Sequence, residues 1–159
     1  MAIEIERKFL LVDDSWRQTA TGILFRQGYL SVAPARTVRV RLEGERGKLT
    51  IKGKSQGIVR VEYEYEIPKD EAAELLDNLC LRPLIEKTRY RVEHVGQLWE
   101  IDVFHAENAG LIVAEIELET ADSRFDLPDW VGAEVSADPR YFNANLVKQP
   151  YSSWGKRRS

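Results

Sequence analysis

The chain opens with the segment Glu4-Ile5-Glu6-Arg7-Lys8-Phe9-Leu10-Leu11. If this segment is a β-strand, alternate side chains point to opposite faces, so that Glu4, Glu6 and Lys8 share one face. Neighbouring carboxylates on a sheet repel each other. That face therefore needs partners of both signs, which could be metal ions together with a polyanion, or other strands with complementary charges.

Seven later segments are also expected to be strands, because most of them alternate between charged and apolar side chains and are bounded by turn-forming residues. The clearest is Val59–Ile67, in which Arg60, Glu62, Glu64 and Glu66 alternate with valine and tyrosine. The expected strands after the first are Ile23–Val32, Thr37–Glu43, Lys48–Lys52, Val59–Ile67, Ile85–Val95, Leu98–Phe104 and Ile112–Leu118. Mostly consecutive strands of this kind predict an antiparallel sheet that closes into a barrel.

Two helices are expected to accompany the sheet, which places the fold in the α+β class. Apolar residues at helical spacing predict the first over Asp70–Leu81. Asp138 and Pro139 fit the N-cap and the first position of a second helix, over Arg140–Val147.

Size and charge limit the class of protein. The chain has 159 residues, 31% of them charged, with a formal net charge of −3. Because it contains no repeat and no long linker, residues 1–159 are expected to form one domain, with a flexible tail at 148–159. A mildly acidic total gives no support for nucleic-acid binding, which favours a clearly basic domain.

Cysteine use and hydropathy point to a reducing compartment. Cys80 is the only cysteine, which rules out an internal disulfide and a cysteine-based zinc site. No apolar run is long enough for a signal peptide or a membrane helix, so we expect a cytoplasmic protein with no membrane partner. The oligomeric state is not readable, and a homodimer stays open.

The charged strand faces allow two interpretations. In an ordinary half-buried sheet they would face water. In a barrel with helices outside, they would instead line the bore, and the recurrence of both signs at i, i+2 on nearly every strand favours this arrangement. A membrane barrel has the same pattern but is rejected, because helical segments interrupt the strands. The bore-facing candidates are Lys8, Arg39, Arg41, Lys52, Arg60, Lys87, Arg89, Arg91, Glu4, Glu6, Glu62, Glu64, Glu66, Glu100, Asp102, Glu115, Glu117 and Glu119.

Confined charges are costly unless they are neutralised by each other or by ligands. Guanidinium and ammonium groups suit phosphate oxygens. Carboxylates without histidine or cysteine suit hard cations such as Mg²⁺ or Mn²⁺. A bore that carries both would hold a metal-bound polyphosphate.

The order of these motifs resembles the CYTH domain of the triphosphate tunnel metalloenzyme family, from residue 4 to about residue 147. The Glu-x-Glu-x-Lys motif alone is a weak signal, but a series of seven different motifs in the same order is specific. The motifs are Glu4-Ile5-Glu6-Arg7-Lys8, Arg39-Val40-Arg41, Lys52, Glu62-Tyr63-Glu64, Glu86-Lys87-Thr88-Arg89, Glu100-Ile101-Asp102 and Glu115-Ile116-Glu117.

The resemblance implies an eight-stranded antiparallel β-barrel tunnel with a charged interior, helices outside and a C-terminal plug helix. It implies that the phosphate-binding residues are Lys8, Arg39, Arg41, Lys52, Lys87 and Arg89. It implies that the main metal, Mg²⁺ or Mn²⁺, is held by Glu4, Glu6 and one or both of Glu115 and Glu117. A second ion, or the orientation of water and basic residues, would depend on Glu62, Glu64 and Asp102.

Two further positions follow from the resemblance. Phe142 stands in the plug segment where a basic residue is often found, so Arg140 is the nearest substitute. The stretch Arg26-Gln27-Gly28-Tyr29-Leu30 resembles the compact bacterial inorganic triphosphatases. In that setting Tyr29 could hydrogen-bond the Lys8 ammonium and join it as a catalytic residue, whereas the alternative is an ordinary strand tyrosine.

The expected reaction is metal-dependent hydrolysis of inorganic triphosphate, a small-molecule substrate, to pyrophosphate and phosphate. Within the family, a class IV adenylate cyclase or a thiamine or nucleoside triphosphatase stays open, although no dedicated adenine pocket is recognisable. A non-catalytic polyphosphate-binding module is the alternative of another class. The many carboxylates argue against it, because anion binding alone does not need them.

Overall fold

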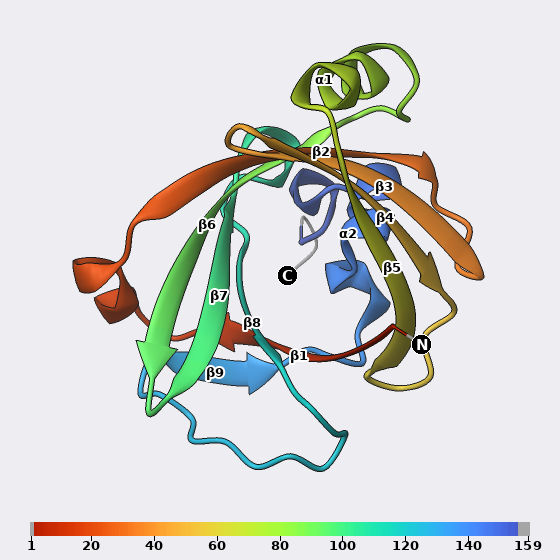
Figure 1. Ribbon diagram of the computed structural model, residues 1–159. Coiled ribbons are helices and arrows are strands. Elements are labelled where there is room, and N and C mark those ends of the chain that lie inside the picture. The colour runs from red at the N-terminus through yellow and green to blue at the C-terminus, as the bar shows by residue number, and fades with distance from the viewer. Residues whose placement is uncertain (1, 156–159) are drawn as a thin grey trace.

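The computed structural model describes residues 2–155, and within them one antiparallel sheet of nine strands contains a closed barrel (Figure 1). The strands are β1 Ile3–Leu11, β2 Gly22–Ser31, β3 Arg36–Glu43, β4 Arg46–Gly53, β5 Val59–Ile67, β6 Ile85–His94, β7 Gln97–Phe104, β8 Ile112–Glu117 and β9 Val131–Glu134. The helices are α1 Lys69–Asn78 and α2 Asn143–Lys148, with 3₁₀ turns at Ser15–Thr19, Ala106–Asn108, Pro139–Tyr141 and Tyr151–Ser153.

The strand order is β5-β4-β3-β2-β6-β7-β8-β1-β9, and a further pairing of β5 with β1 closes the first eight strands into a ring. Strand β1 makes this closure because it pairs with β5 through Ile3–Ile5 and with β8 through Glu6–Phe9. Strand β9 pairs with the C-terminal end of β1, through Phe9 and Leu11. The predicted eight-stranded antiparallel barrel is confirmed, and β9 is an addition to it.

The apolar strand faces point outward and are covered by other parts of the chain. Phe9, Trp99 and Ile116 form one outer cluster beneath Trp16 and Trp130. A second cluster lies under α1, whose buried Ala72 and Leu76 pack over β3 and β4. Figure 1 shows α1 outside the ring of strands. Because these clusters satisfy the outer faces, the charged faces are left for the bore.

One mouth of the barrel is closed by α2. Its Leu146 and Val147, together with Trp154, pack on apolar residues at one end of the bore. These apolar residues are Tyr29, Ile85, Phe104 and Val113. Each of these four lies two positions along its strand from a polar residue of the bore face: Gln27, Lys87, Asp102 and Glu115. Since residues two apart on a strand share a face, the four apolar residues form an inner layer at the same mouth. The predicted plug helix is confirmed.

Both helices are shorter than expected. The first ends at Asn78 rather than Leu81, because the chain turns and the Leu81 amide donates to the Tyr29 carbonyl of β2 (2.9 Å). The expected helix over 140–147 is split, because Phe142 is extended (φ −71°, ψ 129°) between the 3₁₀ turn and α2. Asp138 does act as a cap, since its side chain accepts from the Arg140 amide.

Part of the segment expected to be a tail is packed on the barrel. Trp154 is 9% exposed and makes edge contacts with Tyr141 and Tyr151. Residues 156–159, which include the basic cluster, lie outside the described residues. Within residues 2–155, no helix is long and apolar enough to cross a membrane.

Candidate active site

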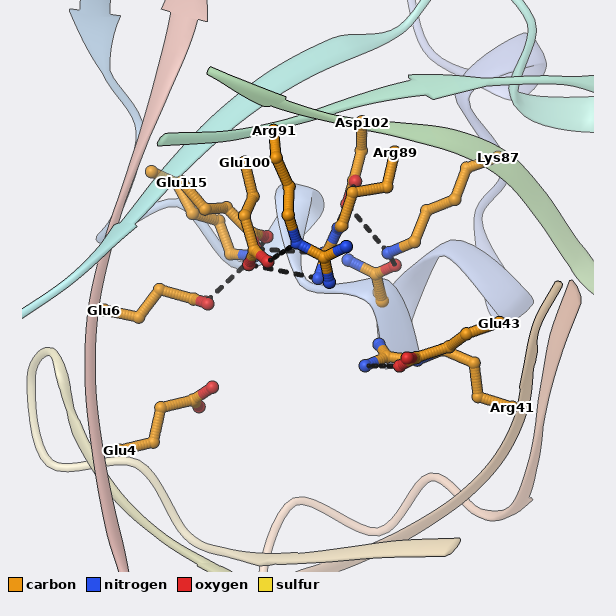
Figure 2. Close-up of polar contacts among 12 residues, drawn as sticks. Glu4, Glu6, Arg41, Glu43, Lys87, Arg89, Arg91, Glu100, Asp102 and Glu115 are labelled. Atoms are coloured by element: carbon orange, nitrogen blue, oxygen red, sulfur yellow. Dashed lines mark hydrogen bonds and ion pairs between the residues drawn. The ribbon is translucent and has the colours of Figure 1, made fainter. Parts of the chain in front are cut away.

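The bore contains a cavity of roughly 240 Å³ that is lined by side chains from all eight barrel strands. Seven of these strands contribute charged side chains, and β2 contributes Tyr29. Among the residues predicted for the site, those that line it are Glu4, Glu6, Lys8, Tyr29, Arg39, Arg41, Lys52, Glu62, Glu64, Lys87, Arg89, Glu115 and Glu117. In Figure 2, Glu4 and Glu6 project from β1 toward the Arg41–Glu43 pair on the opposite wall. The structure therefore brings together residues that lie more than 100 positions apart in the sequence.

Strand register pairs opposite charges across neighbouring strands. Lys8 lies opposite Glu115, and its Nζ is 2.6 Å from Glu115 Oε2. Arg89 lies opposite Asp102. Lys52 lies opposite Glu62, but its shorter contact is to Glu4 Oε1 (2.9 Å). These pairs neutralise part of the bore, as buried charges require.

One wall brings several cations close together around Arg41. The guanidinium carbons of Arg41 and Arg89 lie 4.9 and 5.0 Å from the ring centroid of buried Phe25. Burial, together with the nearby charges of Arg39 and Arg89, lowers the pKa of Arg41 to about 10. Arg39 has a buried Nε with no hydrogen-bond partner among the described residues. This crowding of like charges would be relieved by a bound anion, so the wall fits a phosphate group.

Asp102 lies behind this wall rather than on it. It is 1% exposed, receives two hydrogen bonds from Arg89 (2.8 and 2.9 Å), and lies 2.8 Å from Lys87 Nζ. Burial opposes its charge, but Arg89 and Lys87 outweigh burial and lower the pKa of Asp102 to about 2. Burial lowers the pKa of Lys87 to about 7 despite Asp102. Of the two roles expected for Asp102, its position fits the orientation of basic residues and does not fit metal ligation.

The other wall is crowded with carboxylates. Burial and the neighbouring charges of Glu115 and Glu4 raise the pKa of Glu6 to about 8. Burial and Glu4 also raise the pKa values of Glu62 and Glu117. Within the described residues, no three carboxylates converge closely enough to form a finished metal site. The donor chemistry nevertheless fits a hard cation, because such an ion would relieve the repulsion.

Glu6 gives a pH-dependent prediction for the protein without metal. Its ordinary pKa of 4.5 is raised on folding, so the stabilisation it contributes when protonated is lost as the pH rises toward 8. We expect Glu6→Gln to have the same melting temperature as the parent near pH 4.5. Above pH 8, the variant should be more stable than the parent by about 2 kcal/mol, which corresponds to a melting temperature roughly 4–8 °C higher. Thermal unfolding in a chelating buffer measures this.

The matched control is Glu119→Gln, the same substitution at an exposed position outside the cavity. It should melt with the parent at every pH. If Glu6→Gln showed no gain above pH 8, Glu6 would be ionised in the folded protein without cost, and the repulsion described above would be absent.

Tyr29 does not take the position expected for it. It lines the cavity, but it belongs to the apolar layer at the plugged mouth, and no hydrogen bond between described residues joins it to Lys8. Strands β1 and β2 are separated by three strands in either direction around the barrel, so the two side chains start from opposite walls. Lys8 is instead held by Glu115 and Glu6, whose carboxylate oxygens lie 2.6 and 3.4 Å from its Nζ.

Some cavity residues were missed or misplaced by sequence reasoning. Glu43 and Lys48 line the cavity, and both follow the alternation of their strands, so the pattern could have found them. Asn143 also lines it and has no such pattern. Glu66 and Glu119 were expected in the bore, but they are exposed and do not line the cavity. Their positions near strand ends explain this difference.

Arg140 does not replace the missing basic residue of the plug. Its side chain is 56% exposed and pairs with Asp138 (2.8 Å) outside the cavity. The residues of the plug segment that line the cavity are Phe142, Asn143 and Ala144.

The chain is similar in sequence and in structure to known proteins. The inorganic triphosphatase of Acetivibrio thermocellus is 51% identical over 154 residues, which cover 97% of this chain and 99% of that protein. The inorganic triphosphatase of Nitrosomonas europaea is 36% identical over 91% of this chain and 96% of its own length. The crystal structure of the inorganic triphosphatase NE1496 is 34% identical, with a TM-score of 0.65, and the match covers 90% of this chain and 96% of that one.

The CYTH domain family matches residues 2–151, which span all nine strands and both helices. The match agrees with the order of motifs and with the closed, charged barrel. The chain belongs to the CYTH domain family.

Proposed function

We propose that this protein is a metal-dependent inorganic triphosphatase, which hydrolyses tripolyphosphate to pyrophosphate and phosphate. The observation that carries the proposal is the division of one closed bore into a cationic wall around Arg41 and Arg89 and a carboxylate wall around Glu4 and Glu6. A polyanion alone would satisfy the first wall, and a hard cation alone the second. A metal-bound polyphosphate satisfies both.

The relatives support the same substrate class. Two proteins named inorganic triphosphatase are 51% and 36% identical to this chain over nearly its whole length. Shared fold alone does not assign a reaction, but near-complete coverage together with the same charged bore supports one.

The carboxylates suited to the metal are Glu4, Glu6, Glu62 and Glu117. Glu115 is already engaged by Lys8 and Arg89, at 2.6 and 3.3 Å, and Glu4 by Lys52 at 2.9 Å, so each of the two would hold an ion only by sharing these contacts. Glu64 lies farther along the bore, near Lys48 and Arg39. When bound, Mg²⁺ or Mn²⁺ would neutralise phosphate charge and make the attacking water more acidic.

The chain's own residues bind and orient the substrate. The side chains that would hold phosphate oxygens are Arg39, Arg41, Lys52, Lys87 and Arg89. Asp102 positions Arg89 from behind through two hydrogen bonds. Glu115 and Glu6 outweigh burial and raise the pKa of Lys8, which keeps its ammonium charged. Lys8 therefore fits the guidance of water by hydrogen bonding better than the removal of a proton from it.

The hydrolysis reaction adds one water across a phosphoanhydride bond and releases pyrophosphate and phosphate. An assay of the purified protein with tripolyphosphate, ATP and thiamine triphosphate, with Mg²⁺ or Mn²⁺, tests it. We expect release of phosphate from tripolyphosphate with the highest kcat/KM, and loss of that activity in a chelator. Turnover that persists in the chelator, or formation of cyclic AMP from ATP at a higher kcat/KM, would contradict the proposal.

A further inference from the structure

Asn143 is the polar residue that α2 brings into the cavity at the plugged mouth. Its neighbours Phe142 and Ala144 also line the cavity, but their side chains offer no hydrogen bond. Beyond them, Leu146 and Val147 pack on the apolar inner layer. The plug thus presents one polar side chain to whatever fills this end of the bore.

The orientation of the Asn143 amide is determined by two donors. Gln27 Nε2 donates to Asn143 Oδ1 at 2.9 Å, and Lys87 Nζ donates to the same oxygen at 3.0 Å. In its charged form the Lys87 ammonium group can only donate, and this form therefore favours the oxygen of Asn143 at this position. The Nδ2 group is consequently turned the other way, and no hydrogen bond between described residues uses it.

Gln27 supports this orientation, although one of its own side-chain atoms is left without a hydrogen-bond partner among the described residues. It is fully buried on the inner face of β2, and its Oε1 has no hydrogen-bond partner among the described residues. A buried acceptor without a partner destabilises the fold. The contact that Gln27 does make is the one that orients Asn143, so a role at the plugged mouth gives a reason for a buried amide at this position.

We propose that Asn143 donates its amide hydrogens to the terminal phosphate group of the substrate, so that the plugged mouth selects polyphosphates with an unsubstituted end. This inference rests on the proposed function. Lys87, on the same side of the cavity, supplies the charge, and Asn143 supplies directed donors. Among the described residues, a buried apolar cluster that includes Leu146, Val147 and Trp154 fills the space behind the Asn143 side chain, so a nucleoside or a longer chain would have to point to the other mouth.

Asn143→Asp tests the donor directly. The carboxylate still accepts from Gln27 and Lys87, but it replaces the two amide hydrogens with a negatively charged oxygen. We expect Kd for tripolyphosphate, measured by calorimetry without divalent metal, and KM in the metal-dependent assay to rise about tenfold or more, as for a lost hydrogen bond to a charged group. A dinucleoside triphosphate, which has no free end, should bind parent and variant with equal affinity.

The control is Lys148→Gln, which makes the same change of one charge unit on the exposed side of α2, outside the cavity. It should leave both constants within about twofold. Asn143→Ala, with a several-fold loss expected, replaces Asn143→Asp if the latter does not fold.

Two outcomes separate this inference from the proposed reaction. A parent that binds tripolyphosphate but does not hydrolyse it would overturn the reaction, while the affinity comparison would still decide the role of Asn143. Equal affinity of parent and Asn143→Asp for tripolyphosphate would overturn the inference, as would an equal loss for the substrate without a free end.

Discussion

Replacing Asp102 by alanine is expected to lower the free energy of unfolding by about 3 kcal/mol and the melting temperature by roughly 6–12 °C. Asp102 is 1% exposed and neutralises two buried cations, Arg89 and Lys87. Removal of one partner from a buried ion pair leaves an uncompensated charge, and here two groups are left. Arg89 keeps contacts to Glu100 and Glu115, which prevents a larger loss.

The pH dependence has a definite sign. The pKa of Asp102 is lowered from 3.8 to about 2 on folding, so its stabilisation is present above pH 3.8 and is lost as the pH falls through 2. The difference between parent and Asp102→Ala should therefore be full at neutral pH and shrink toward pH 2. Thermal and urea unfolding measure it.

Asp77→Ala is the matched control for Asp102→Ala. Asp77 pairs with Arg26 at 3.4 Å, and its side chain is 62% exposed, so this variant should lose less than about 1 kcal/mol. A melting temperature of Asp102→Ala within 2 °C of the parent would show that Asp102 does not support the cationic wall.

Alternation of charge along the strands predicted which side chains share a face, but not how deep each one lies. Asp102 and Glu100 both follow the pattern of β7, yet Glu100 lines the cavity and Asp102 lies behind Arg89. Depth depends on strand tilt and on which longer side chain covers a shorter one. Neither property is contained in the period of one strand.

Strand order is the second property that local patterns did not contain. Strand β2 pairs with β6 rather than with β1, and this places Tyr29 across the barrel from Lys8. The pairing joins segments separated by the whole of α1 and three strands. Closure of the sheet into a barrel was predicted from the number and order of the strands, whereas the neighbours of each strand depend on contacts across the chain.

The plug illustrates a third limit. A helix was predicted over 140–147, but the extended backbone of Phe142 interrupts it. This interruption changes which residue of the segment faces the bore. A one-residue change in helical phase moves a side chain by about 100°, so the sequence could suggest a plug without identifying Asn143 as its polar contact.

Arg41→Ala should separate a role in phosphate binding from a role in stability. Arg41 is 7% exposed and crowded by Arg39 and Arg89, so its removal relieves repulsion that the protein without substrate bears. Glu43 loses its 2.7 Å partner but keeps Lys48 at 3.2 Å. We therefore expect a melting temperature within a few degrees of the parent.

The effect of Arg41→Ala on tripolyphosphate hydrolysis should be much larger. A preorganised charged donor that faces developing phosphate charge contributes about 10²–10³-fold to catalysis, so kcat/KM should fall by about that factor. Arg46→Ala is the control, since Arg46 is 65% exposed, lies outside the cavity and pairs with Glu66. A small loss of kcat/KM in Arg41→Ala would remove Arg41 from the phosphate wall. A large loss of stability would mean that the contacts of Arg41 with Glu43 and Phe25 outweigh its repulsion by Arg39 and Arg89 and support the fold.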